Sequence, residues 1–393
     1  MNFVENLDLK GKRVFLRVDF NVPLDEKGQI RDDTRIRASL PTIKYILGQK
    51  AKLVVASHLG RPKGQVNLKL SLQPVAKRLE ELISKPIIFA PDCIGDEVRK
   101  LKQELQENQV LLLENLRFHA EEASNDPGFA HKLAEDIDYY VNDAFGTCHR
   151  AHASVAAITQ FVQKSAAGYL LKKEVDYLTK AVQSPQRPYV AILGGAKVSD
   201  KIPVIENLLN KADDILIGGA MAYTFLKAQG DDVGRSLVEE DKKEIALNLL
   251  EKAREKKVNF YLPQDHVLAP SLEAEAKTLT VDSFPFPPDL MAVDIGPKTA
   301  ETYANIIKKA KTIVWNGPMG VFEVDAFAQG TIKIAEAVAN SKALSIVGGG
   351  DSVAAVEKAG VSSKITHIST GGGATLEYLA YETLPGLEAL KGK

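Results

Sequence analysis

One pattern repeats along the whole sequence: a short apolar run, a sharp end in Gly, Asp, Asn or His, and then a segment with helical periodicity. Most of the runs are aliphatic or β-branched on both faces, which is typical of parallel strands covered by helices on both sides. We therefore expect an α/β fold of doubly wound, Rossmann-like parallel sheets with right-handed crossovers. The expected strands cover residues 13–19, 52–57, 87–90, 110–113, 139–142, 190–193, 214–217, 312–315, 344–347 and 365–368.

A helix is predicted over residues 169–183, between two blocks of such units. Leu171, Val175, Leu178 and Val182 recur there at helical spacing, and the segment SPQRP then interrupts the pattern. A chain of 393 residues favours two domains, so we interpret this helix as a bridge between two lobes. The alternative is an ordinary crossover helix within one large sheet.

The composition excludes several classes of protein. Fifty basic and fifty-one acidic side chains give a net charge of −1, which provides no field to hold a nucleic acid or an anionic membrane. Cys93 and Cys148 are too few for a disulfide framework or a four-thiolate zinc site. The first residues lack the features of a signal peptide, and no apolar stretch reaches about eighteen residues. We expect a cytoplasmic protein without nucleic-acid or membrane partners.

Basic and polar residues follow the expected strands of the first lobe. Ligands of open parallel sheets bind beyond the carboxyl ends of the strands, so these positions are candidates for a site. Ten of the thirteen arginines precede residue 151, and guanidinium groups suit phosphate and carboxylate. We expect a site for an organic phosphate that also carries carboxylate and hydroxyl groups, although any one arginine alone could be a surface ion pair. The candidates are Asp19, Asn21, Arg35, His58, Arg61, Arg117, His119 and Arg150.

Histidines near the end of the first lobe raise the question of a metal. His149 and His152 are three residues apart, and together with His58 or His119 they could form a zinc site. Flanking arginines would repel the cation, and a zinc site also needs supporting residues around its ligands. We therefore favour hydrogen bonding to phosphate or carboxylate, with core packing as the alternative.

Glycine-rich turns mark the second lobe. In ILGGAKVSDKI, Gly194 and Gly195 let the backbone approach a ligand, and Lys197 and Lys201 share one face of the following helix. Neither G-x-x-x-x-G-K-[ST] nor a clean G-x-G-x-x-G occurs, so the sequence supports no P-loop and no dinucleotide fingerprint. A glycine-rich turn with a solvated lysine is the alternative.

Amide and acidic groups follow later strands of the same lobe. VWNGPMGVFE contains Asn316, Pro318 and Glu323, and SIVGGGDS ends with Asp351 and Ser352. One carboxylate can hold Mg²⁺ when nucleotide phosphates and water complete its octahedron, so Asp351 is the candidate ligand. Its alternative role is to cap the next helix. The glycines of HISTGGGAT could form an anion-binding nest at a helix start.

Nine segments stand out in order along the chain: RVDFNVP, SHLGRP, LLENLRFH, DAFGT-HRAHAS, GGAKVSDKI, GGAMAYTF, WNGPMGVFE, GGGDS and STGGGA. Together they resemble the phosphoglycerate kinase family. The resemblance implies reversible phosphoryl transfer between 1,3-bisphosphoglycerate and ADP, giving 3-phosphoglycerate and ATP, by direct in-line transfer after two lobes close. It also implies Mg²⁺ with ATP or ADP as co-substrate, and a monomer. The implied parts are an acid-substrate lobe over residues 1–170, a bridging helix over 171–183, a nucleotide lobe over 184–377 and a segment over 378–393 that returns to the first lobe.

The resemblance also implies roles for residues at matching positions. Glu323 would bind the ribose and Asp351 would bind Mg²⁺. Arg35, Lys197 and Lys201 would surround the transferred phosphoryl group as catalytic residues. The acid substrate would bind Asp19, Phe20, Asn21, Arg35, His58, Leu59, Gly60, Arg61, Arg117 and Arg150. The nucleotide would bind Gly195, Lys197, Lys201, Gly218, Gly219, Asn316, Pro318, Glu323, Gly349, Gly350, Asp351 and Ser352.

Two other classes of protein remain as alternatives. An NAD-dependent dehydrogenase would share the glycine-rich turns, and a non-catalytic two-lobed phospho-ligand binding protein would share the cleft. The chain also departs from the family pattern, with Cys148 where alanine is common and Ala292 where glycine is often found. Cys148 precedes His149 and Arg150, so a lowered thiol pKa and a redox role are a further hypothesis.

Overall fold

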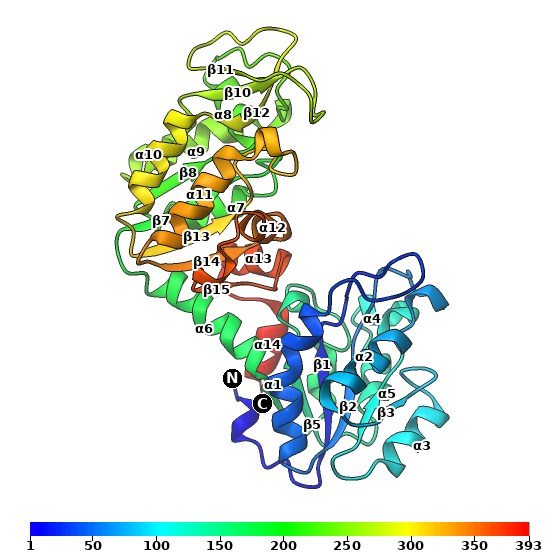
Figure 1. Ribbon diagram of the computed structural model, residues 1–393. Coiled ribbons are helices and arrows are strands. Elements are labelled where there is room, and N and C mark those ends of the chain that lie inside the picture. The colour runs from blue at the N-terminus through cyan, green and yellow to red at the C-terminus, as the bar shows by residue number, and fades with distance from the viewer. Residues whose placement is uncertain (393) are drawn as a thin grey trace. The chain divides into compact units, whose positions relative to one another are not determined.

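The computed structural model describes residues 1–392, which divide into two compact units. Unit 1 comprises Met1–Asp176 together with residues 383–392, and unit 2 comprises Tyr177–Glu382 (Figure 1). The division falls within α6 (Tyr169–Gln183), where the sequence predicts a helix. Each unit contains its own six-stranded sheet and its own buried apolar cluster.

The sheet of unit 1 is parallel throughout, in the order β3-β4-β2-β1-β5-β6. The chain adds strands on one side of β1 and then on the other, so the winding direction reverses between β1 and β5. Ligand crevices of open α/β sheets lie at such a reversal, beyond the carboxyl ends of the strands. The strands are β1 (Arg13–Val18), β2 (Lys52–Ala56), β3 (Ile87–Phe89), β4 (Val110–Leu112), β5 (Tyr139–Asp143) and β6 (Lys164–Ala167). The helices are α1 (Thr34–Gly48), α2 (Gln73–Ile83), α3 (Asp96–Glu104), α4 (Ala120–Ala123), α5 (Pro127–Ala134) and α14 (Pro385–Lys391).

The central strands of unit 1 are buried, as their continuous apolarity predicts. Five of the six residues of β1 and all five residues of β5 are buried. Leu16 and Val18 of β1 belong to one core cluster with Ile43 of α1. Arg17 lies between these two strand residues and is fully buried as well, so β1 carries a cation into the interior.

Helix α14 completes unit 1 although it follows unit 2 in the chain. It contacts β6 and the 3₁₀ helix Ala157–Phe161. Gly386 and Leu390 are buried, and Gly386 N donates a 2.9 Å hydrogen bond to Cys148 O. A Cβ atom on Gly386 would lie 2.9 Å from Cys148 Cα, so a residue without a side chain is needed at this contact. Unit 1 is therefore assembled from two separate stretches of chain.

The main sheet of unit 2 is also parallel, in the order β15-β14-β13-β7-β8-β9. Its winding direction reverses between β7 and β13. All ten strands expected from the sequence occur in the two parallel sheets, and β6 and β9 are additional. The strands are β7 (Tyr189–Leu193), β8 (Asp214–Ile217), β9 (Asn259–Tyr261), β13 (Thr312–Asn316), β14 (Leu344–Gly348) and β15 (His367–Ile368). The helices are α7 (Ile202–Leu208), α8 (Met221–Ala228), α9 (Lys243–Glu255), α10 (Pro297–Ile307), α11 (Gln329–Asn340), α12 (Gly350–Lys358) and α13 (Gly373–Tyr381).

A small antiparallel sheet in unit 2 was not predicted from the sequence. Its order is β11-β10-β12, with β10 (His266–Ala269), β11 (Leu279–Val281) and β12 (Met291–Ile295). β11 is largely exposed, so it has no continuous apolar run to reveal it. The sheet packs on Phe327 through a small cluster with Ala269 and Val293.

Within residues 1–392, no helix has the length and apolarity required to cross a membrane. The longest helices, α1 and α6, have fifteen residues each. A membrane-spanning helix needs about 20 predominantly apolar residues.

Candidate active site

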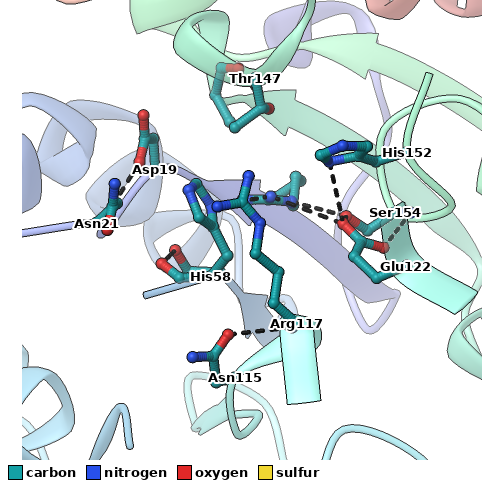
Figure 2. A network of polar contacts seen from close by, with 12 residues as sticks. Asp19, Asn21, His58, Asn115, Arg117, Glu122, Thr147, His152 and Ser154 are labelled. Carbon is teal, nitrogen blue, oxygen red and sulfur yellow. Dashed lines mark hydrogen bonds and ion pairs between the residues drawn. The ribbon is translucent and has the colours of Figure 1, made fainter. Parts of the chain in front are cut away.

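The loops after β1 and β2 bring several of the predicted acid-site residues together in unit 1 (Figure 2). Asp19 follows β1, and its Oδ2 pairs with Arg35 Nη1 at 2.8 Å. Arg35 is the second residue of α1. Asn21 Oδ1 accepts a 2.8 Å hydrogen bond from Gly60 N, which follows β2. These contacts fix the two loops and the start of α1 against one another at the carboxyl end of the sheet.

Asn115 and Arg117 hold the same loop from the end of β4. Asn115 Oδ1 accepts a hydrogen bond from Leu59 N, and Asn115 Nδ2 donates a 2.7 Å hydrogen bond to Leu59 O. Arg117, in the 3₁₀ helix Leu116–Phe118, donates from Nη1 to Gly60 O at 2.9 Å. Gly60 has φ +63°, which favours glycine at this turn. Burial lowers the pKa of Arg117 to about 10, so this guanidinium is still protonated at neutral pH.

A buried ion network lies next to His58. Arg17 Nε donates to Ser154 Oγ at 2.8 Å, and Arg17 Nη1 donates to the Val18 carbonyl. Arg17 Nη2 lies 3.2 Å from His58 Nδ1 and 3.9 Å from Glu122 Oε1. Glu122 accepts from both Ser154 N (2.9 Å) and Ser154 Oγ (2.6 Å). Glu122, Ser154 and His152 face one another in Figure 2.

Arg17, Ser154 and Glu122 were not predicted from the sequence to belong to the site. One signal was available for Arg17, because a charged residue interrupts the apolar run RVFLRV at a position that faces the interior. An arginine inside such a strand requires a buried acid or several acceptors. No comparable pattern marks Glu122, which lies in the short helix α4 and reaches the network only through the tertiary fold.

Two histidines of this region are held neutral. Burial, followed by the charges of Arg17 and Arg117, lowers the pKa of His58 well below its usual range. Burial and the same arginines lower the pKa of His152 to about 4. Glu122 Oε1 lies 3.9 Å from His152 Nδ1, which is too far for a hydrogen bond. Burial and the neighbouring positive charges therefore lower the pKa of His152 more than the nearby carboxylate raises it.

Four further predicted residues divide into exposed cations and buried apolar groups. Arg61 and Arg150 are exposed, and neither side chain has a hydrogen bond or ion pair within residues 1–392. Phe20 and Leu59 have buried side chains, and Phe20 N already donates to Ser57 Oγ at 2.8 Å. Arg61 and Arg150 are thus available to a ligand, whereas Phe20 and Leu59 shape the loops.

Cys148 does not have the lowered pKa that its sequence neighbours suggested. The thiol is fully buried, and burial raises its pKa to about 12. Sγ lies 3.5 Å from Ala144 O and 3.6 Å from Asn142 Nδ2, which are neutral partners. The prediction of a lowered pKa was wrong because it considered only the residues next to Cys148 in the chain. Desolvation by the surrounding core has a larger effect on the thiol pKa than these neighbours have.

In unit 2, the glycine-rich turns and predicted nucleotide residues line a cavity of about 350 Å³. The cavity lies at the carboxyl ends of β7, β13 and β14, where the winding of the sheet reverses. Lys197 is exposed at its edge, without a hydrogen bond or ion pair in the described chain. The predicted residues that line it are Gly195, Lys197, Lys201, Asn316, Gly349, Gly350, Asp351 and Ser352.

Lys201 is the buried cation of this cavity. Its Nζ donates to Asn316 Oδ1, and Asn316 Nδ2 donates a 2.7 Å hydrogen bond to Gly348 O. Burial lowers the pKa of Lys201 to about 8, despite the opposing charges of Asp200 and Asp351. The ammonium is therefore mostly protonated at neutral pH. Its pKa is nevertheless close enough to neutral pH for bound phosphate to change the protonated fraction.

An adjoining cavity of about 220 Å³ shares Gly195, Ala196 and Asp351 with the first. Its wall includes the predicted Gly219, Pro318 and Glu323 together with apolar residues from β12 and α8. Gly218 lines neither cavity. A Cβ atom there would overlap Met319 Sδ, so the missing side chain allows close packing of the neighbouring turn.

The single residue Asp351 and one cluster of three side chains are potential metal ligands in the described chain. Asp351 is exposed in the first turn of α12 and has no hydrogen bond or ion pair there, so its carboxylate is free to meet a hard cation. Asp92, Cys93 and His119 also place donor atoms within 4.8 Å of one another. In that group Asp92 Oδ1 and His119 Nε2 already bond to each other at 2.7 Å, and the thiol is buried.

Comparisons with known proteins agree along the whole chain. The family model described as phosphoglycerate kinase matches residues 4–382. A phosphoglycerate kinase of Acidobacterium capsulatum is 61% identical over 399 residues, covering 99% of each chain. One of Anaeromyxobacter sp. is 58% identical over 391 residues, also covering 99% of each chain. The solved structure of phosphoglycerate kinase from Coxiella burnetii matches with a TM-score of 0.90 at 43% identity, covering 99% of this chain and 98% of that one.

Proposed function

Because this chain belongs to the phosphoglycerate kinase family, whose members transfer a phosphoryl group to a carboxyl acceptor, we propose a substrate for each of its two units. Unit 1 binds 3-phosphoglycerate or 1,3-bisphosphoglycerate, and unit 2 binds ATP or ADP. The observation that carries this assignment is the contrast between the two strand-end sites. Unit 1 presents guanidinium groups, whereas unit 2 presents glycine-lined cavities with a buried lysine and an exposed aspartate.

The acid site is supported by the two arginines whose side chains have no partner within residues 1–392. Arg61 and Arg150 are free to pair with phosphate, whose oxygens match a guanidinium in bidentate geometry. Within residues 1–392, Arg35 pairs only with Asp19, and because the Arg35 side chain is 39% exposed, this pair can open toward a more highly charged anion. Asn21 and His58 supply neutral polar groups for the hydroxyl and carboxylate of the same ligand.

The nucleotide site is supported by the two adjoining cavities of unit 2. Backbone N–H groups at the start of α12, together with Lys201, suit the phosphates in the larger cavity. Glu323 and the apolar wall of the smaller cavity suit the ribose and the base. Asp351 lies in the lining of both and would hold Mg²⁺, which supplies charge neutralisation for the phosphates when it is bound.

The proposed transfer needs no general base. A carboxylate and a nucleotide phosphate are both ionised near neutral pH, so either can attack directly in line. The work of the protein is to align the substrates, exclude water and neutralise charge on the oxygens of the transferred group. We assign that neutralisation to Arg35, Lys197 and Lys201. Because the substrates bind different units, closure of the units around the bound pair must precede transfer.

The test is magnesium-dependent ADP formation from ATP, with 3-phosphoglycerate present or omitted and a downstream dehydrogenase removing the acyl phosphate. We expect ADP only when the acid, ATP and Mg²⁺ are all present. No turnover in any combination would refute the proposal. Small-angle scattering adds a separate test of closure, since the absence of compaction with both substrates bound would contradict it. Action as a monomer without nucleic-acid partners stays a prediction, as do the functional boundaries at residues 170, 184 and 377.

A further inference from the structure

The contact between Arg17 and His58 restricts where the imidazole can carry its proton. A guanidinium group has only N–H donors and no acceptor, and it stays protonated at every pH at which the protein is folded. Arg17 Nη2 lies 3.2 Å from His58 Nδ1. The contact is a hydrogen bond only when Nδ1 offers its lone pair, which requires a neutral ring with its hydrogen on Nε2.

We propose that Arg17, Ser154 and Glu122 form a positioning relay that fixes His58 in the neutral Nε2–H tautomer, so that His58 donates this hydrogen to the anionic acid substrate. The identity of the acceptor rests on the proposed function, whereas the tautomer rests on the buried network alone. Within residues 1–392, His58 Nε2 has no hydrogen-bond partner of its own. The donor is therefore available to a ligand.

Two hydrogen bonds of Ser154 connect Glu122 to Arg17 and orient the guanidinium group. Its hydroxyl has one hydrogen, and Glu122 Oε1 at 2.6 Å accepts it because a buried carboxylate is the stronger acceptor. The oxygen lone pairs of Ser154 then face Arg17 Nε at 2.8 Å. The Val18 carbonyl takes a second guanidinium N–H. With these two donors fixed, the planar group leaves Nη2 pointing at His58 Nδ1.

Glu122 also balances the buried charge. His58 faces Arg17, Arg117, Arg35 and His152, which are all cationic or neutral. Glu122 is the fully buried carboxylate of this network, 3.9 Å from Arg17 Nη2. Without it, Arg17 would be an unbalanced cation in the core, and such a charge is strongly destabilising. The relay therefore holds the Arg17 guanidinium in position and allows it to stay buried.

A fixed neutral donor suits a site that already contains several arginines. An imidazolium would add positive charge beside them, and the other tautomer would direct a lone pair at the substrate anion. The Nε2–H form avoids both conditions, so its hydrogen bond does not change with pH over the range in which the enzyme works. Figure 2 shows His58 next to Arg117 and facing the same region as Asp19.

The first measurement is made on the wild-type protein. In ¹⁵N-labelled protein, long-range ¹H–¹⁵N correlation assigns the protonated nitrogen of His58 directly, with a His58→Gln variant to identify its signals. We expect hydrogen on Nε2, an unprotonated Nδ1, and no titration between about pH 5.5 and 8.5. Hydrogen on Nδ1, or an imidazolium within this range, overturns the inference whether or not the protein is active.

The second measurement removes the relay with Ser154→Ala. We expect a mixed tautomer signal, and a KM for 3-phosphoglycerate raised about three- to tenfold, the factor for one hydrogen bond, while the KM for ATP is unchanged. The matched control is Thr159→Ala, which removes another buried hydroxyl of unit 1. This hydroxyl donates a 2.9 Å hydrogen bond to Ala156 O, so its removal should change neither readout. A Ser154→Ala protein with the wild-type tautomer and KM overturns the relay. Correct tautomers in a protein without kinase activity would refute the proposed function and leave the tautomer assignment intact.

Discussion

We expect Lys201 to set the basic limb of the pH–rate profile. Burial lowers the pKa of its ammonium from 10.5 to about 8, a difference that corresponds to about 3 kcal/mol in favour of the neutral amine. The neutral fraction is then about 10% at pH 7 and about 90% at pH 9. If the charged form stabilises the transferred phosphoryl group, kcat/KM for ATP should fall about tenfold per pH unit above pH 8, because this parameter reports the free enzyme.

The assay compares this limb in three proteins at saturating 3-phosphoglycerate and constant free Mg²⁺. Lys201→Arg carries a guanidinium that stays protonated, so the limb at pH 8 should disappear even if the maximal rate is lower. Lys252→Arg is the matched control, because Lys252 is a half-exposed lysine of unit 2 that pairs with Glu206 at 2.8 Å. It should keep the wild-type profile. A wild-type rate that is flat to pH 10, or a Lys201→Arg profile that still falls at pH 8, refutes the assignment.

Three other changes have definite expected outcomes. Arg35→Ala should lower kcat by about a hundredfold, as removal of a charge-stabilising group does; a raised KM for 3-phosphoglycerate with unchanged kcat would contradict its catalytic role. Burial raises the pKa of Asp143 to about 7, so the folded protein keeps a proton that the unfolded chain releases above pH 4, and stability falls as pH rises through that window. Asp143→Asn keeps the acceptor for the Leu170 and Leu171 N–H groups, and should raise the urea midpoint more at pH 8 than at pH 5; an equal change at both would count against this reasoning. Wild-type protein and Cys148→Ala should lose equal activity in peroxide, whereas protection by the substitution would restore the redox hypothesis.

The parts of the fold that could be predicted are those with a strong local pattern. Continuous apolar runs marked ten of the twelve strands in the two parallel sheets, because strands that are covered on both faces require such runs. β11 was missed because an exposed antiparallel strand needs no such run. β6 was missed because KSAA is short and built from small residues.

The same distinction applies to the candidate sites. Asp19, His58 and Asp351 directly follow strands or begin a helix after one, so their positions in the chain mark them. Glu122 is joined to Arg17 only by tertiary packing, and nothing within its own segment distinguishes it from a surface glutamate. The pKa of Cys148 likewise depends on what surrounds it in space, which adjacent residues do not reveal.

The return of residues 383–392 to unit 1 has a consequence for the order in which the molecule can form. During synthesis, the sheet of unit 1 leaves the ribosome well before α14, so the surface of β6 that this helix contacts stays open while all of unit 2 is made. Unit 2, by contrast, is continuous in the chain and can fold as soon as it emerges. A circular permutant that places residues 383–392 ahead of β1 would supply the covering helix first, and would reverse which of the two units is complete before the other.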